Sequence, residues 1–186
     1  MTSTIFANKD ALRKEMRARL SAMTAGGVSR RSSLLLERLR EGGWLPPGST
    51  VTLFGGIQGE PDLLELVPWL LERGSVPVFF GFSEGMLVPQ RVDDAGLLHR
   101  GVFGVWVPPP EAEVVPYEDL DVILTPGLAF SGSGVRLGRG KGHYDRLFGR
   151  SEVKARRIGL CWDFQLVDTV PMEPHDALMN AVISDA

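Results

Sequence analysis

Cysteine is almost absent from this chain, because Cys161 is the only one among 186 residues. A single cysteine excludes an internal disulfide and a metal cage built from thiolates. Cys161 lies within an apolar run. We therefore expect it to be a small, buried, hydrophobic side chain.

Long apolar runs are also missing. No segment approaches the roughly 20 apolar residues that span a bilayer, and the N-terminus lacks the apolar core of a signal peptide. The chain has no internal repeat and no low-complexity linker. These absences predict a cytoplasmic protein that does not bind membranes, organised as one domain over residues 1–186.

Excess positive charge is lacking as well, since 20 Lys and Arg residues stand against 23 Asp and Glu residues, for a net charge of −3. This balance disfavours a general grip on nucleic acid. An RNA-associated protein is a weak alternative, because the aromatic residues are not interleaved with basic ones. Any site for an anion must come from local clustering of cations.

Glycine is plentiful, and one stretch from Gly127 to Asp145 combines it with cations. The stretch follows the apolar run Asp121–Thr125, which predicts a buried strand, and leads into a predicted helix from about His143 to Phe148. Glycines alternate with other residues just before that helix, at Gly138, Gly140 and Gly142.

Such a loop has the chemistry of an anion site. Glycine tolerates a positive φ and has no Cβ, so backbone N–H groups can turn toward an anion. The helix N-terminus adds positive potential, and Arg136, Arg139 and Lys141 add charge. The stretch therefore suits a polyphosphate. A flexible surface loop with solvated charges is the alternative.

Common nucleotide-binding patterns do not fit this stretch. A P-loop needs a glycine where Val135 stands and Ser or Thr where Gly142 stands. The dinucleotide pattern G-x-G-x-x-G fails because His143 takes its last position. A polyphosphate site here must belong to another class.

Two neighbouring segments form a pattern, Pro126-Gly-Leu-Ala-Phe130 and Gly134-x-Arg136-Leu-Gly138-Arg-Gly140-Lys-Gly142-x-Tyr144-Asp145. This pattern resembles the signature of the 5-formyltetrahydrofolate cyclo-ligase family. The resemblance extends over nearly the whole chain, and it implies that Arg139 and Lys141 act in catalysis. The ATP-binding residues that it implies are Lys9, Arg13, Arg136, Leu137, Gly138, Arg139, Gly140, Lys141, Gly142, His143 and Tyr144.

The N-terminal segment Lys9–Met23 predicts an amphipathic helix. Its apolar stripe is Leu12, Met16, Leu20 and Met23, and a second stripe consists of Lys9, Arg13 and Arg17. The residues alone favour a solvated basic face. The resemblance instead implies that Lys9 and Arg13 reach the phosphates of the nucleotide.

Strand and helix signals alternate along the rest of the chain. This alternation predicts a three-layer α/β/α sandwich with a mostly parallel sheet and ligands at the carboxyl ends of the strands. We expect strands at Val51–Phe54, Val76–Phe80, Met86–Val88, Arg157–Trp162 and Ala177–Ile183, a helix capped by Ser29 and ended by Gly42-Gly43, and a helix over Asp62–Arg73 that is kinked or split at Pro68.

The substrate side of the predicted site follows the strand Val51–Phe54. By sequence alone, Glu60 suits a loop glutamate exposed to solvent as well as it suits a ligand-binding acid. The resemblance implies that Gln58 and Glu60 hold polar groups of the folate and that Gly55 helps to shape the pterin pocket. Trp106 suits either stacking on a pterin or a place in the core or at its rim. The resemblance adds to this substrate set Arg139, Gly140, Lys141, Gly142 and His143.

Two aspartates are candidates for Mg²⁺, which proteins usually hold through one or two carboxylates together with phosphate oxygens and water. By sequence alone, Asp145 is as well explained as an acid in the first turn of a helix. The resemblance implies that Asp145 and Asp176 both bind the metal.

Three positions depart from the family pattern. Gly81 stands where an arginine is common, which leaves Arg91 as the nearest substitute. Ser131 replaces a frequent aspartate, a change expected to affect loop geometry. His143 replaces a tyrosine, and it suits either contact with folate or a place as the first residue of a helix.

The resemblance implies an ATP- and Mg²⁺-dependent enzyme that cyclises the small molecule 5-formyltetrahydrofolate to 5,10-methenyltetrahydrofolate, with release of ADP and phosphate. We expect a monomer. A non-catalytic module that binds nucleotide or folate is the alternative, which the three departures keep open.

Overall fold

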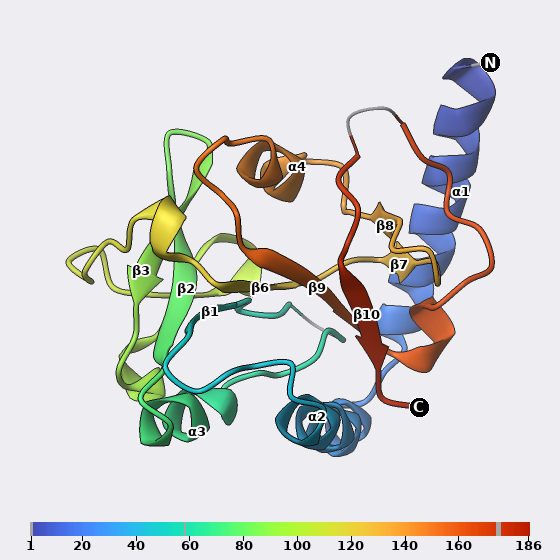
Figure 1. Ribbon diagram of the computed structural model, residues 1–186. Coiled ribbons are helices and arrows are strands. Elements are labelled where there is room, and N and C mark those ends of the chain that lie inside the picture. The colour runs from blue at the N-terminus through green and yellow to red at the C-terminus, as the bar shows by residue number, and fades with distance from the viewer. Residues whose placement is uncertain (1, 58, 174–175) are drawn as a thin grey trace.

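A single mixed sheet, drawn through the middle of Figure 1, organises the chain. The computed structural model describes residues 2–57, 59–173 and 176–186. The strands are β1 Thr50–Leu53, β2 Val76–Ser83, β3 Met86–Arg91, β4 His99–Arg100, β5 Trp106–Val107, β6 Val122–Thr125, β7 Ala129–Phe130, β8 Arg136–Leu137, β9 Arg156–Cys161 and β10 Ala181–Ser184, and the helices are α1 Thr2–Ser21, α2 Ala25–Glu41, α3 Leu66–Glu72 and α4 His143–Phe148.

The six-stranded sheet has the order β10-β9-β6-β1-β2-β3. Its neighbouring strands pair in parallel except β3, which pairs antiparallel with β2 at one edge. Two small ribbons, β4-β5 and β7-β8, lie outside this sheet. The predicted mixed α/β fold with a mostly parallel sheet is confirmed.

Helices lie on both sides of the sheet. In Figure 1, α2 and α3 lie below it, α4 lies above it, and α1 runs beside the β7-β8 ribbon. Leu35, Leu36 and Leu39 of α2 are fully buried in the main core, together with Val51 and Leu53 of β1. Among the described helices, none is both long and apolar enough to cross a bilayer.

The strand order places a switch point at β1. The chain moves from β1 to β2 on one side, whereas β6 flanks β1 on the other side. Parallel strands end at the same edge, so the segments that leave β1 and β6 diverge from one crevice, where ligands bind in folds of this kind. We call residues 54–57 and 59–61 the β1 loop, and residues 134–142 the glycine loop.

Helix α2 begins earlier than the sequence predicts. Thr24 is its N-cap, and the Thr24 side chain accepts a hydrogen bond from the Gly27 backbone N–H at 3.1 Å. Ser29 lies inside the helix, so its prediction as the cap is wrong. Thr24 and Ser29 have side chains that can cap a helix, and in the structure Thr24 is the cap.

Helix α3 is shorter than predicted, because residues 62–65 form turns. The Leu64 N–H donates to the Asp62 carboxylate, and the Leu66 N–H donates to the carbonyl of Leu63. Pro68 consequently falls in the first turn of α3, where backbone N–H groups have no partner within the helix. The predicted interruption at Pro68 is therefore wrong, and the helix is continuous over Leu66–Glu72.

Two alanine substitutions test the position of the α2 cap. Thr24→Ala should lower the free energy of unfolding by about 1 kcal/mol, because it removes the side-chain acceptor for the Gly27 N–H. Ser29→Ala should change it by less than about 0.5 kcal/mol, because alanine suits a helix interior. Chemical denaturation of both variants measures the difference, and an equal loss in both would contradict this assignment.

Candidate functional site

The glycine loop adopts the backbone conformations that its composition requires. Gly140 and Gly142 have φ values of 94° and 66°, a region that disfavours residues with a Cβ. A Cβ at Gly138 would lie 3.0 Å from Nη1 of Arg136. Helix α4 starts at His143 directly after the loop, as predicted.

The basic stripe of α1 lies against this loop. The Arg13 Nε donates to the carbonyl oxygen of Gly138 at 3.2 Å, and the Arg17 Nη2 donates to the carbonyl oxygen of Arg139 at 2.9 Å. The stripe therefore faces the glycine loop, and the alternative of a purely solvated basic face is wrong.

Lys9 is the most enclosed cation of the stripe, with an exposed fraction of 3%. Its Nζ lies 2.6 Å from Glu173 Oε2 and 2.7 Å from Asp176 Oδ2. Burial alone lowers the pKa of Lys9, but the hydrogen bonds and charges of Asp176 and Glu173 outweigh that effect and raise it. Lys9 is therefore charged at neutral pH.

An ion pair connects the β1 loop with the glycine loop. Glu60 Oε1 accepts hydrogen bonds from Nη2 and Nε of Arg139 at 2.6 and 3.0 Å. Glu60 is buried, and its Oε2 accepts from the Ile57 N–H at 3.1 Å. The alternative of a solvent-exposed loop glutamate is wrong. Gln58 lies outside the described residues.

A second ion pair joins β8 to α4. Arg136 Nη2 lies 3.0 Å from Asp145 Oδ1, and the Arg136 guanidinium lies over the Tyr144 ring at 5.3 Å from its centroid. Burial raises the pKa of the Tyr144 phenol, so it stays protonated at neutral pH. Arg136 is itself buried, so its charge is held in place by Asp145 and Tyr144.

A cavity of about 420 Å³ lies beside Glu60. It has the size and the mixed polar and apolar lining of a small-molecule site. Its lining comes from the β1 loop, from helix α2 and the residue Met23 before it, from the turns before α3, and from the β4-β5 ribbon. The lining residues are Met23, Ala25, Val28, Ser29, Ser32, Leu36, Phe54, Gly56, Ile57, Gly59, Glu60, Pro61, Asp62, Leu64, Glu65, Arg100 and Trp106.

Trp106 reaches this cavity because Gly55 lets the β4-β5 ribbon approach β1. The Trp106 N–H donates to the Gly55 carbonyl at 2.8 Å, and a Cβ on Gly55 would lie 1.9 Å from the Trp106 oxygen. The Arg100 guanidinium stacks on the Trp106 ring, 3.8 Å from its centroid. Trp106 is thus half-buried at the cavity wall, with a cation against its ring.

The two candidate metal ligands lie in different surroundings. Asp145 is 28% exposed beside Arg136, whereas Asp176 accepts from Lys9 and from the Glu173 N–H at 2.7 Å. Within the described residues, no group of three or more His, Cys, Asp or Glu side chains surrounds a metal position. Carboxylate oxygens are the ligands that Mg²⁺ prefers, and one or two of them suffice beside phosphate oxygens, so these residues fit that mode.

The structure also explains the departures from the family pattern. Arg91 pairs with Val78 near the start of β2, at the edge opposite the crevice, and binds Asp93, so it does not substitute for the missing arginine. Ser131 Oγ accepts from the Val135 N–H at 3.1 Å, which confirms a role in loop geometry.

His143 packs its ring edge against Phe82, with centroids 4.8 Å apart, and its Nδ1 lies 2.7 Å from Arg146 Nη2. Burial, and secondarily the charge of Arg146, lowers the pKa of His143. Its place as the first residue of α4 matches the prediction of a residue that begins a helix, and its contact with folate stays a prediction.

Two residues just after β9, Trp162 and Gln165, were not predicted as part of the site, yet Trp162 contacts the β1 loop and Gln165 contacts the segment that follows β6. Trp162 Nε1 donates to the carbonyl of Gly59, and Gln165 Nε2 donates to the carbonyls of Gly127 and Leu128. The available signal was their place at the carboxyl end of the predicted strand Arg157–Trp162, since ligands are expected at the carboxyl ends of the strands.

Comparisons with known proteins identify the family of this chain. Residues 5–185 match the model of the 5-formyltetrahydrofolate cyclo-ligase family. The 5-formyltetrahydrofolate cyclo-ligase of Mycolicibacterium smegmatis is 36% identical over 80% of this chain and 84% of its own length. The enzyme of that name from Escherichia coli K12 is 34% identical over 73% of this chain and 77% of its own.

Two solved structures are also similar. The 5,10-methenyltetrahydrofolate synthetase of Aquifex aeolicus superposes with a TM-score of 0.83 at 30% identity, over 95% of this chain and 89% of that one. The synthetase of Mycoplasma pneumoniae has a TM-score of 0.77 over 96% of this chain and 99% of that one, and its 21% identity supports the fold alone.

A thiol nucleophile has no part in this site, which yields a labelling prediction. Cys161 is completely buried, and burial raises its pKa to about 12. The native protein at pH 8 should therefore resist a thiol-specific chromogenic disulfide, whereas the protein in denaturant should react with one equivalent. Rapid stoichiometric labelling of the native protein would contradict the burial of Cys161.

Proposed function

Because the chain belongs to the 5-formyltetrahydrofolate cyclo-ligase family and is an enzyme of that kind, we propose that it uses ATP and Mg²⁺ to convert 5-formyltetrahydrofolate to 5,10-methenyltetrahydrofolate. The observation that carries the proposal is the ion pair between Glu60 and Arg139 at 2.6 Å. It links a cavity suited to an organic substrate with a cationic loop suited to a polyphosphate.

The cavity supports the assignment of the folate side. A reduced pterin presents N–H donors, and the buried Glu60 carboxylate is an acceptor at the cavity wall. Trp106 offers an aromatic surface, provided that Arg100 shares it or moves aside. Gly55 acts through the approach of Trp106, and Gln58 keeps its assigned contact with the folate as a prediction.

The nucleotide side uses the cations around the glycine loop. Phosphoryl transfer requires alignment and neutralisation of charge more than covalent help from the protein. Arg139 and Lys141 are assigned to the transferred phosphoryl group. The other residues assigned to ATP are Lys9, Arg13, Arg136, Leu137, Gly138, Gly140, Gly142, His143 and Tyr144, and the substrate set shares Arg139, Gly140, Lys141, Gly142 and His143.

The proposed reaction proceeds in two steps. The formyl oxygen on N5 attacks the γ-phosphorus, and the bond to the β-phosphate oxygen breaks, which releases ADP. N10 then attacks the formyl carbon and loses its proton, and the C–O bond breaks to release phosphate. Phosphorylation is needed because an amide oxygen is a poor leaving group.

Asp145 and Asp176 are the residues that would hold the metal, and a bound Mg²⁺ would neutralise charge on the phosphates. Lys9 and Arg136, which bind these two aspartates, are themselves assigned to phosphate oxygens. The same side chains can therefore orient the nucleotide and the carboxylates together.

The alternative of a non-catalytic module loses its basis, because the relatives that match most of the chain are enzymes by name. We expect the enzyme to act as a cytoplasmic monomer on its small-molecule substrate, without a nucleic-acid or membrane partner. Size-exclusion chromatography with light scattering tests the monomer.

The direct test is turnover. Purified protein with 5-formyltetrahydrofolate, ATP and Mg²⁺ should produce the near-ultraviolet absorbance of the methenyl product and one ADP per turnover. Omitting ATP, or chelating the metal, should abolish the signal, and added Mg²⁺ should restore it. Binding of both ligands without the absorbance would overturn the proposal.

A lysine substitution tests the assignment of the loop cation. Lys141→Ala should lower kcat/KM by about 100-fold, because a charge that faces the transferred phosphoryl group is lost. The melting temperature should hardly change, since Lys141 is exposed. Lys154→Ala, which removes an exposed lysine from the segment between α4 and β9, is the control and should keep full activity. Equal activities of the two variants would exclude Lys141 from catalysis.

A further inference from the structure

We propose that Trp162 and Gln165 are positioning residues that hold both ligand-binding segments to the end of β9. This inference rests on the proposed cyclisation. Trp162 follows the last residue of β9, and Gln165 ends the 3₁₀ turn Asp163–Gln165. Strand β9 neighbours β6, so this turn lies beside the crevice from which the ligand loops leave the sheet.

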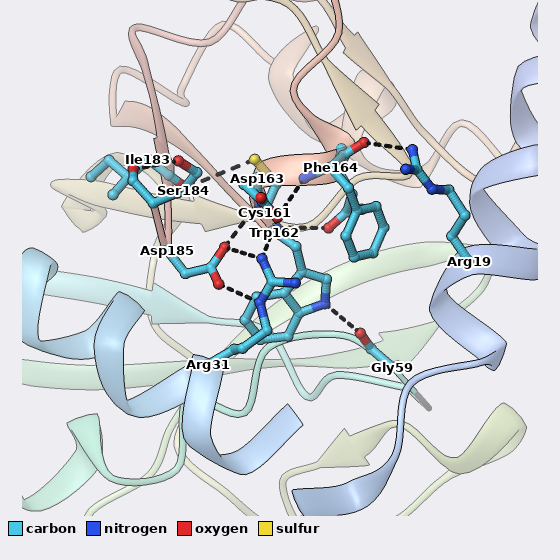
Figure 2. Close-up of polar contacts among 12 residues, drawn as sticks. Arg19, Arg31, Gly59, Cys161, Trp162, Asp163, Phe164, Ile183, Ser184 and Asp185 are labelled. Atoms are coloured by element: carbon cyan, nitrogen blue, oxygen red, sulfur yellow. Dashed lines mark hydrogen bonds and ion pairs between the residues drawn. The ribbon is translucent and has the colours of Figure 1, made fainter. Parts of the chain in front are cut away.

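Trp162 fixes the β1 loop. Its ring is completely buried, and its Nε1 donates to the carbonyl oxygen of Gly59 at 2.7 Å (Figure 2). On its other side Gly59 abuts α1, because a Cβ there would lie 2.3 Å from the Leu20 oxygen. Gly59 has a φ of 84°, and the next residue is Glu60. The indole therefore sets the point from which Glu60 reaches Arg139.

Gln165 fixes the segment after β6. Its Nε2 donates to the carbonyls of Gly127 and Leu128 at 2.8 and 3.0 Å, and its Oε1 accepts from the Trp162 N–H at 2.9 Å. The Gln165 amide is buried and uses both donors and its acceptor. Residues 127 and 128 lead into the β7-β8 ribbon, which carries Arg136 and continues into the glycine loop.

Arg31 restrains the Trp162 ring from α2. Its guanidinium lies 5.3 Å from the ring and donates to Asp185 Oδ1 at 2.8 Å (Figure 2). It also forms an ion pair with Asp163, and Asp185 accepts from the Asp163 N–H at 2.9 Å. The turn that contains Trp162 and Gln165 is thereby bound to α2 and to the residue after β10.

Neither residue has a role in the chemistry, so each should affect the ligand whose segment it holds. Without the indole N–H, the Gly59 carbonyl loses a buried partner, and Glu60 is held less firmly. Without the Gln165 amide, two buried carbonyls at the base of the β7-β8 ribbon lose theirs. The first loss should weaken folate binding, and the second should weaken nucleotide binding.

The test measures KM for both substrates, together with kcat, in Trp162→Phe and Gln165→Met. Trp162→Phe should raise KM for 5-formyltetrahydrofolate about tenfold and KM for ATP less than about twofold, and Gln165→Met should show the reverse order. Both should retain kcat within about threefold. Each protein is measured below its own melting temperature.

Two controls separate positioning from general loss of stability. Cys161→Ala removes a fully buried group from the adjacent position, and Trp69→Phe removes an indole N–H from α3. Both should leave the two KM values unchanged. Equal shifts of both KM values within each variant, or shifts no larger than those of Cys161→Ala, would overturn the inference. If Trp162→Phe does not fold, Gln165→Met and its controls decide the question.

Failure of this inference is distinguishable from failure of the proposed function. A wild-type protein that produces no methenyl absorbance refutes the cyclisation. Wild-type turnover that is accompanied by unshifted KM values in both variants refutes only the positioning role.

Discussion

The ion pair between Glu60 and Arg139 is the interaction on which the site depends. The two residues are 79 positions apart in the chain, yet the carboxylate and the guanidinium lie 2.6 Å from one another. The parallel pairing of β1 with β6 brings them together, because both strands end at the same edge of the sheet. A buried carboxylate without a partner destabilises the folded protein. Because Glu60 is buried and pairs with Arg139, the pair also restrains the positions that the two loops can take.

The same rule applies to the other enclosed cations. Lys9 is compensated by Glu173 and Asp176, and Arg136 is compensated by Asp145. A triphosphate offers these cations another anionic partner of similar hydrogen-bonding capacity. In the proposed function, these cations would contact phosphate oxygens as well as their carboxylates within a formed site, which limits the reorganisation that accompanies the arrival of the ligand.

The local parts of the fold could be predicted from the sequence. Glycine loop geometry and the start of α4 follow from single residues, because Gly140 and Gly142 occupy backbone regions that other residues disfavour. The burial of Lys9 and Glu60 could not be predicted in this way. Whether a charged side chain faces water or a carboxylate that is distant in sequence depends on which segments of the chain pack together, and composition does not encode that directly.

Predictions from the sequence were wrong where a local pattern fitted two different structures. Thr24 and Ser29 are both residues that cap helices well, and in the structure Thr24 begins α2 shortly after α1 ends at Ser21. In the sequence, Arg91 is the nearest substitute for the arginine that is missing at position 81. The antiparallel direction of β3 carries it back to the opposite edge instead.

The departure at Gly81 shows how packing can account for an altered site. A Cβ on Gly81 would lie 2.1 Å from Oε1 of Gln90, whose Nε2 donates to the carbonyls of Pro109 and Ala112. The Gln90 side chain therefore occupies the space beside Gly81 and ties β3 to the segment that follows β5. An arginine at position 81 would displace this contact. In this chain the enclosed cations near the glycine loop come from α1 and β8, and β2 contributes Phe82 as a ring against His143.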